Sequence, residues 1–99
     1  MPLSITGTMS AIVTPFDTEG RIDERALIAL VDAQIEGGMN AIVPCGTTGE
    51  TPTLQSDEFA LVVKTVVDRV AGRIPVIVGT GSNSTQKTIE TTQRAKELG

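Results

Sequence analysis

The chain has 99 residues, 39% of them hydrophobic and 20% charged, which is enough for one small folded domain with a modest core. Its net charge of -4 and its two aromatic residues argue against a nucleic-acid partner, and it holds neither a long apolar run nor a signal-peptide pattern. One cysteine and no histidine exclude, within this chain, a disulfide, a thiolate or histidine metal site and Ser-His or Cys-His catalysis. We therefore expect a cytoplasmic protein that contacts no membrane.

The first third of the chain predicts a strand followed by a helix. A short β-branched run at 10–14 reads as a buried strand that ends at Pro15. Asp23 is then placed as the N-cap of a helix over about 23–37, whose apolar residues recur at helical spacing until Gly37 and Gly38 stop it.

The same order recurs twice. A strand is predicted at 41–43, followed by a helix that Ser56 caps and that ends at Gly72. Its apolar stripe has the cleanest helical spacing in the sequence: Phe59, Val62, Val63, Val66, Val67 and Val70. A third strand is predicted at 75–78, followed by a helix that Ser84 caps. Four of its residues are expected to face inward: Thr88, Ile89, Thr92 and Ala95.

Short apolar strands that alternate with helices predict an α/β fold with a parallel sheet. Three such units fit three-eighths of a (β/α)8 TIM barrel, so residues 1–99 are interpreted as one part of a single barrel domain. A three-stranded parallel sheet would also expose unpaired edges of the kind that favour association. The expected fold is therefore an incomplete barrel that belongs to a larger protein.

The main candidate site is the segment Gly46-Thr47-Thr48-Gly49, which follows a strand and precedes a helix. Loops at the carboxyl ends of strands are where α/β folds bind ligands. Its two hydroxyls and successive backbone N–H groups suit a carboxylate or a phosphate. The alternative is a tight turn whose glycines only satisfy positive φ. The glycine spacing and the lack of a following lysine exclude a P-loop.

Other candidates have a structural interpretation that is favoured over a functional one. The segment 79–84 resembles a dinucleotide fingerprint, but Ser84 stands where the third glycine belongs and is better interpreted as a helix cap. Glu50 could act as a general base, but a charged loop residue is more often a cap or an ion-pair partner. Cys45 could act as a nucleophile, but no partner base is visible, so it is interpreted as a small buried residue. Thr14 and Pro15 could line a pocket or only shape a strand end. The lysines at 64, 87 and 96 all look solvated, so none is placed like a Schiff-base amine.

Three motifs in the same order closely resemble the N-terminal third of the dihydrodipicolinate synthase family. They are Ala11 to Phe16, Gly46 to Glu50 with Thr53 and Leu54, and Pro75 to Gly81. That family and its relatives, N-acetylneuraminate lyase and 2-keto-3-deoxy sugar acid aldolases, are TIM barrels that bind pyruvate as a Schiff base. The resemblance implies a cytoplasmic lyase of lysine and diaminopimelate biosynthesis. By this resemblance the whole protein is expected to condense pyruvate with aspartate semialdehyde, to need no cofactor or metal, and to form a homo-oligomer, namely a homotetramer.

The resemblance also assigns roles within the candidate loop. Thr47 matches the threonine that relays protons between two tyrosines, and Thr48 matches the residue that holds the pyruvate carboxylate, with Gly46 beside them. The Schiff-base lysine, both tyrosines and an arginine would lie beyond Gly99 or in partner chains, so we expect the 99-residue chain alone to be inactive.

Alternatives to the synthase remain open. A sugar acid aldolase or N-acetylneuraminate lyase of the same family is one, although two consecutive threonines favour the synthase. A non-catalytic partial barrel that self-associates is another. Family members regulated by lysine carry other residues where this chain has Ser56, Phe59 and Lys87, and only Asn83 is kept. We therefore expect weak or absent feedback by lysine.

Overall fold

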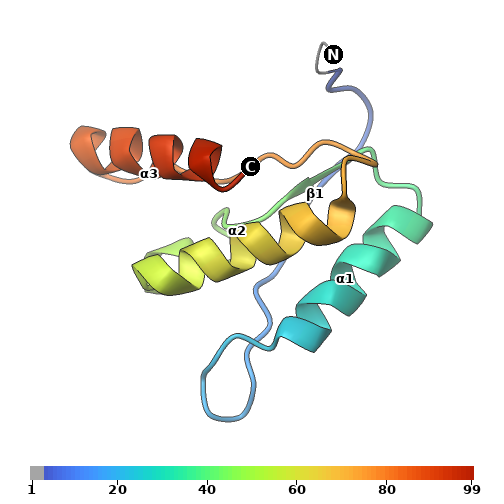
Figure 1. Ribbon diagram of the computed structural model, residues 1–99, viewed down its shortest axis with the longest axis horizontal. Helices are drawn as coiled ribbons and strands as arrows, with labels where there is room; N and C mark the ends of the chain where they lie inside the picture. The colour runs from blue at the N-terminus through green and yellow to red at the C-terminus, as the bar shows by residue number, and fades with distance from the viewer. Residues whose placement is uncertain (1–3) are drawn as a thin grey trace.

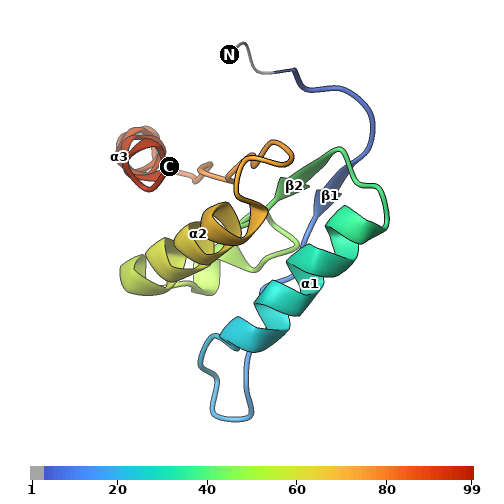
Figure 2. The ribbon, with the colours of Figure 1, turned by 45° about the vertical axis from the view of Figure 1, so that its right-hand side comes forward.

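The computed structural model describes residues 4–99, and it confirms the α/β class. Along the chain the elements are β1 (Met9–Ala11), α1 (Glu24–Glu36), β2 (Ala41–Val43), the short 3-10 helix η1 (Thr51–Thr53), α2 (Ser56–Val70) and α3 (Thr85–Glu97). Helices α1 and α2 lie side by side over one face of the sheet, and α3 stands apart from them (Figures 1 and 2). Within residues 4–99 no helix combines the length and apolar character needed to cross a membrane.

The helix starts follow local side-chain chemistry. The caps predicted for α1 and α3 are confirmed: Asp23 Oδ1 accepts from the Ala26 N–H at 3.0 Å, and Ser84 Oγ accepts from the Lys87 N–H at 3.3 Å. The prediction that Ser56 caps α2 is wrong. Gln55 is the N-cap, because Glu58 reaches back and accepts from its backbone N–H at 2.8 Å.

The sheet is parallel, but its third strand is not formed. β1 pairs with β2 in the register Met9↔Ala41 to Ala11↔Val43. Segment 75–79 runs along the other side of β2 and makes one bridge, Ile42↔Val76. The Gly79 N–H still donates to the Pro44 carbonyl at 2.9 Å, but Pro44 has no N–H with which to complete the next bridge. The predicted strand at 75–78 is therefore a single bridge beside β2.

The first strand is also shorter than predicted, since β1 ends at Ala11 and not at 14. The Ile12 N–H still donates to the Val43 carbonyl at 3.2 Å. β2 then leaves the sheet, because Pro44 follows Val43 and Cys45 takes a left-handed backbone conformation with φ 58°. Without a neighbouring strand, residues 13 and 14 are free to make other contacts.

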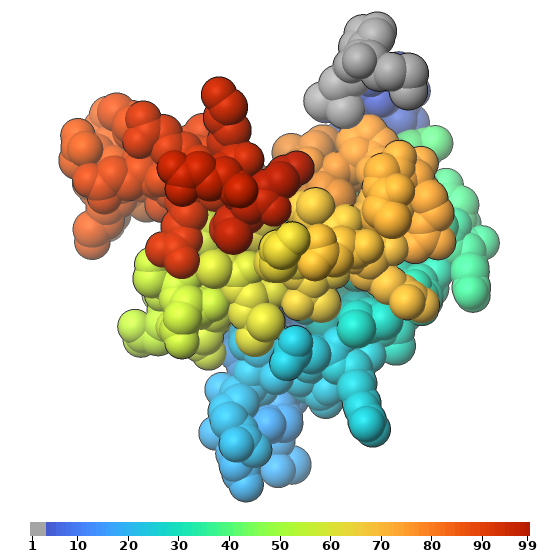
Figure 3. Space-filling view, viewed as in Figure 1, coloured from blue at the N-terminus to red at the C-terminus, as the bar shows by residue number. Residues whose placement is uncertain are grey.

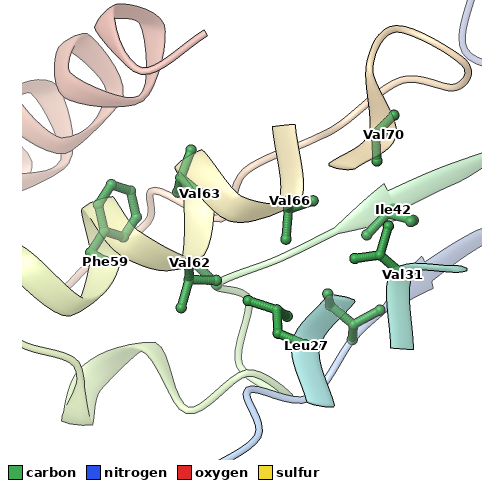
Figure 4. Close-up of a cluster of buried hydrophobic side chains, with 10 residues drawn as sticks. Leu27, Val31, Ile42, Phe59, Val62, Val63, Val66 and Val70 are labelled. Atoms are coloured by element: carbon green, nitrogen blue, oxygen red, sulfur yellow. The ribbon is translucent and has the colours of Figure 1, made fainter. Parts of the chain in front are cut away.

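The core lies between the sheet and the two helices that cover it (Figure 4). The stripe predicted for α2 is confirmed, with five residues buried and Val67 half-buried against them. The partners from α1 and β2 are Leu27, Val31 and Ile42, each with no exposed surface. Burying this set drives the first two βα units together.

Helix α3 contributes little to that core and projects from one side of the molecule (Figure 3). The inward face predicted for it is partly wrong: Ile89 is 47% exposed and Thr92 is exposed, whereas Thr88 and Ala95 are half-buried. The half-buried positions continue to Leu98, which packs with Ala95 against the core. Ile89 lies outside this half-buried stripe.

Candidate functional site

The candidate site is the segment of residues 44–50, here called the threonine loop, which joins the end of β2 to η1. Its two threonines, Thr47 and Thr48, are both exposed. The Gly49 N–H donates to the Gly46 carbonyl at 3.1 Å, and the Glu50 N–H donates to the Thr47 carbonyl at 3.0 Å. The loop is thus a pair of overlapping turns with the two threonines at its crest.

The backbone amides at that crest are free. Among residues 4–99, the N–H groups of Thr47 and Thr48 donate to no acceptor. Each therefore has a hydroxyl and an N–H available for a ligand. Adjacent N–H groups with a hydroxyl can bind the two oxygens of a carboxylate. The crest offers the N–H groups and hydroxyls that the predicted anion site requires, and anion binding itself stays a prediction.

Thr14 anchors one end of the threonine loop. Its side chain is 4% exposed, and its Oγ1 donates to the Gly49 carbonyl at 2.7 Å. A Cβ on Gly49 would lie 3.2 Å from that hydroxyl and 3.2 Å from the Cys45 nitrogen, so little room remains for a side chain. Of the two roles considered for Thr14, it shapes the strand end by bonding the candidate loop.

Gly79 anchors the other end. Its N–H donates to the Pro44 carbonyl, and a Cβ built on it would overlap the Cys45 carbonyl and lie 2.9 Å from Gly46 Cα. The two glycine-containing loops thus pack backbone against backbone. Both loops follow predicted strands, but sequence reasoning had no signal for this contact, which depends on the path of the chain.

Cys45 and Glu50 have structural positions. Cys45 is 1% exposed, and burial raises the pKa of its thiol to about 11, which favours the protonated form over the nucleophilic thiolate. The interpretation as a small buried residue is confirmed. Glu50 is exposed with φ 59°, and its carbonyl accepts from the Thr53 hydroxyl at 2.8 Å. Among residues 4–99 its carboxylate makes no hydrogen bond or ion pair.

The three lysines weighed as amines are all exposed, as expected. Lys64 pairs with Asp68, one helical turn along α2, at 2.9 Å. Lys87 and Lys96 lie on α3. None lies in the buried apolar pocket that activates a Schiff-base lysine. No group of three or more potential metal ligands occurs among residues 4–99.

A cavity of about 690 Å³ lies between the start of α2, the loop at 79–83 and α3. All four positions compared with lysine-regulated family members line it, namely Ser56, Phe59, Asn83 and Lys87. Arg94 also lines it and donates from Nη1 to Ser56 Oγ at 3.1 Å. Sequence reasoning missed Arg94, although it stands two helical turns after Lys87. Both charged residues that line the cavity within the described chain are cations.

A model of the dihydrodipicolinate synthetase family matches residues 4–99. The chain belongs to this family. Among its curated relatives, the 4-hydroxy-tetrahydrodipicolinate synthase of Syntrophotalea carbinolica is 54% identical over 94 residues, which are 95% of this chain and 32% of the relative. The synthase of Citrifermentans bemidjiense is 58% identical over 93 residues, 94% of this chain and 32% of the relative. The chain therefore spans about a third of the length of these relatives.

Solved structures of family members have the same fold over this part. A chloride-inhibited dihydrodipicolinate synthase from Acinetobacter baumannii, complexed with pyruvate, is 47% identical with a TM-score of 0.94, covering 97% of this chain and 33% of that one. The synthase of Methylacidiphilum fumariolicum is 45% identical with a TM-score of 0.92, covering 97% and 32%. Over residues 4–99 the chain thus has the fold of about a third of these family members.

Proposed function

We propose that this chain is the N-terminal third of a TIM-barrel 4-hydroxy-tetrahydrodipicolinate synthase. The whole protein would be a cytoplasmic lyase, by resemblance a homotetramer, that condenses pyruvate with aspartate semialdehyde through a Schiff base. Family membership and the synthase names of relatives more than 50% identical support this proposal. The observation that carries it is the exposed Thr47-Thr48 pair, with free amides, on a loop anchored at both ends.

In this proposal Thr48 and the free N–H groups of the crest bind the pyruvate carboxylate. That contact would hold the keto carbon toward an amine supplied by a residue outside residues 1–99, and a fixed orientation lowers the entropic cost of the reaction. Thr47 would relay protons. A hydroxyl is donor and acceptor at once, so it can pass a proton without acquiring a charge.

The test is made on the full-length protein that carries this sequence. Borohydride reduction in the presence of pyruvate should add one pyruvate to a single lysine, detected by mass spectrometry. Thr48→Val should raise the pyruvate KM. Thr47→Val should lower kcat by about a hundredfold, a typical loss for a proton-transfer group. Thr18→Val changes an exposed threonine in a distant loop and should alter neither. Absence of an adduct in the unmodified protein would overturn the proposal.

One observation favours a second candidate, a non-catalytic partial barrel that self-associates. Met9 and Val13 are 39% and 52% exposed, and among residues 4–99 β1 pairs on one side only, with β2. Exposed apolar residues beside an unpaired strand edge promote association. Light scattering on the isolated 99-residue chain separates the candidates, since a monodisperse monomer would exclude self-association.

The cavity supports the expectation of weak or absent lysine feedback as part of the proposal. Free lysine carries two ammonium groups and one carboxylate, so its net charge is positive, and Lys87 and Arg94 supply charges of the same sign. Repulsion from two cations lowers affinity for such a ligand. A sugar acid aldolase of the same family remains the alternative enzyme, and assays with 2-keto-3-deoxy sugar acids decide between them.

A further inference from the structure

The Thr14 hydroxyl is a buried polar group to which the proposed function gives no role. It lies beyond the end of β1 and bonds a carbonyl 35 residues away. Its acceptor, Gly49, directly follows Thr48 and closes the turn that contains both threonines. We propose that Thr14 is a positioning residue that fixes Thr47 and Thr48 for pyruvate by holding the Gly49 carbonyl. This inference rests on the proposed function.

The hydrogen bond from Thr14 to the Gly49 carbonyl is suited to such a role because water cannot readily take the place of the hydroxyl. Thr14 is 4% exposed and Gly49 is buried, so water has little access to the Gly49 carbonyl. At 2.7 Å the contact has the length of a good O–H···O hydrogen bond. If the hydroxyl is removed, the Gly49 carbonyl has no hydrogen-bond donor. A movement of the turn toward solvent would then let water donate to this carbonyl.

The other contacts show why a movement at Gly49 reaches the crest. The Gly49 N–H donates to the Gly46 carbonyl, so the two glycines enclose the threonines in one tight turn. The end near Pro44 is held by Gly79 independently of Thr14. Loss of the Thr14 bond would therefore free one end only. The turn would pivot and displace Thr48 more than it displaces the strand.

Two matched pairs of variants in the full-length protein isolate the hydroxyl. Thr14→Val keeps the shape of threonine but lacks the hydroxyl. Thr14→Ala likewise differs from Thr14→Ser only by the hydroxyl. Thr14→Val and Thr14→Ala should each raise the pyruvate KM about tenfold or more over the matched hydroxyl-bearing protein, since small misplacements of a binding group are costly. Thr14→Ser should restore KM to within about twofold of the unmodified protein, because it keeps the donor.

A core variant separates positioning from general loss of stability. Val70→Ala removes buried methyl groups far along α2 and should lower the melting temperature while leaving the pyruvate KM unchanged. If Val70→Ala raises KM as Thr14→Val does, or if both variants without the hydroxyl keep a normal KM, the positioning role is wrong. If the unmodified protein forms no borohydride-trapped pyruvate adduct, the proposed function fails first. If Thr14→Val does not fold, the serine and alanine pair decides.

Discussion

Gly79 lies directly against the carbonyl of Cys45, so close that a Cβ at position 79 would overlap the carbonyl oxygen. Its N–H donates to the Pro44 carbonyl at 2.9 Å, next to that contact. Gly79 is absent from the residues with positive φ, so the requirement for glycine is steric. The threonine loop can approach segment 75–79 only because this residue has no side chain.

We predict that Gly79→Ala destabilises the protein by about 1–3 kcal/mol, the usual cost of overpacking, and raises the pyruvate KM of the full-length protein. The added methyl group must displace the threonine loop from its contact with residue 79. Gly81→Ala is the matched control, since a Cβ there has nothing within 4 Å. Denaturant unfolding and steady-state kinetics measure both effects. Equal unfolding free energies and equal pyruvate KM values for the two variants would contradict the contact.

We predict that the Cys45 thiol of the folded 99-residue chain reacts slowly with a disulfide reagent at pH 8. Burial raises its pKa from 9.0 to about 11, which lowers the thiolate fraction about a hundredfold, and it also blocks access. Denaturant should restore the rate of a free thiol. Since Cys45 is the only cysteine in the sequence, the signal has one source. Equal rates with and without denaturant would mean that the loop is not packed as described.

Arg69 of α2 holds Asp32 of α1 through two bonds, Nε to Oδ1 at 2.7 Å and Nη2 to Oδ2 at 2.6 Å. Hydrogen bonding to the guanidinium lowers the pKa of Asp32 below its ordinary 3.8. Because the folded-state pKa is the lower one, the pair stabilises the fold above about pH 4 and loses this contribution as pH falls through the lowered pKa. Arg69→Gln should therefore make unfolding less dependent on pH in this acid range.

The control for that prediction is Lys64→Gln, which removes an exposed cation from a pair within one helix. Equilibrium unfolding at several pH values compares the two variants. Some acid dependence should persist in Arg69→Gln, because the backbone N–H of Arg21 also lowers the pKa of Asp17. An unchanged profile would show that the Asp32 pair contributes nothing, as happens with many exposed ion pairs.

We predict that low-millimolar lysine does not inhibit the full-length protein. Lys87→Glu should increase its sensitivity to lysine, because the change supplies a carboxylate to a cavity whose described charges are Lys87 and Arg94. Lys96→Glu makes the same charge change on α3 outside the lining residues and should have no effect. Initial rates over a lysine titration measure this. Inhibition of the unmodified protein at low-millimolar lysine would refute the prediction.

We also predict that the isolated 99-residue chain forms no Schiff base with pyruvate. Its lysines are exposed and lie on helices α2 and α3. An amine in open solvent lacks the desolvated pocket that activates a lysine as a nucleophile. Incubation with pyruvate and borohydride followed by mass spectrometry gives the answer. A stable adduct on Lys64, Lys87 or Lys96 would refute the prediction.

The sequence predicted those parts of the fold that depend on neighbours along the chain. The cap at Asp23 and the stripe of α2 are local signals, and both are confirmed. The start of α2 was misplaced by one residue, because two polar residues in succession, Gln55 and Ser56, compete for the cap. Pro44 is a sequence signal against a full third strand, because it lacks the N–H that the next bridge to segment 75–79 needs.

The arrangement of the site depends on contacts that the sequence does not encode locally. The position of the threonine loop after β2 followed from the order of elements. The anchors of the loop did not follow from that order, because Thr14 lies 35 residues from Gly49 and Gly79 lies 35 residues from Pro44 in the sequence. The face of α3 was predicted wrongly at Ile89, because a helix with few apolar residues gives a weak stripe.

The lack of any buried residue in α3 implies that stability is unevenly distributed along the chain. Opening α3 would expose little apolar surface, whereas opening α1 or α2 would break the core they share with the sheet. Amide hydrogens of α3 should therefore exchange with solvent sooner than those of α2. The cavity would then open and re-form as α3 detaches and returns. The threonine loop would stay in place, because it joins the core formed by the sheet, α1 and α2.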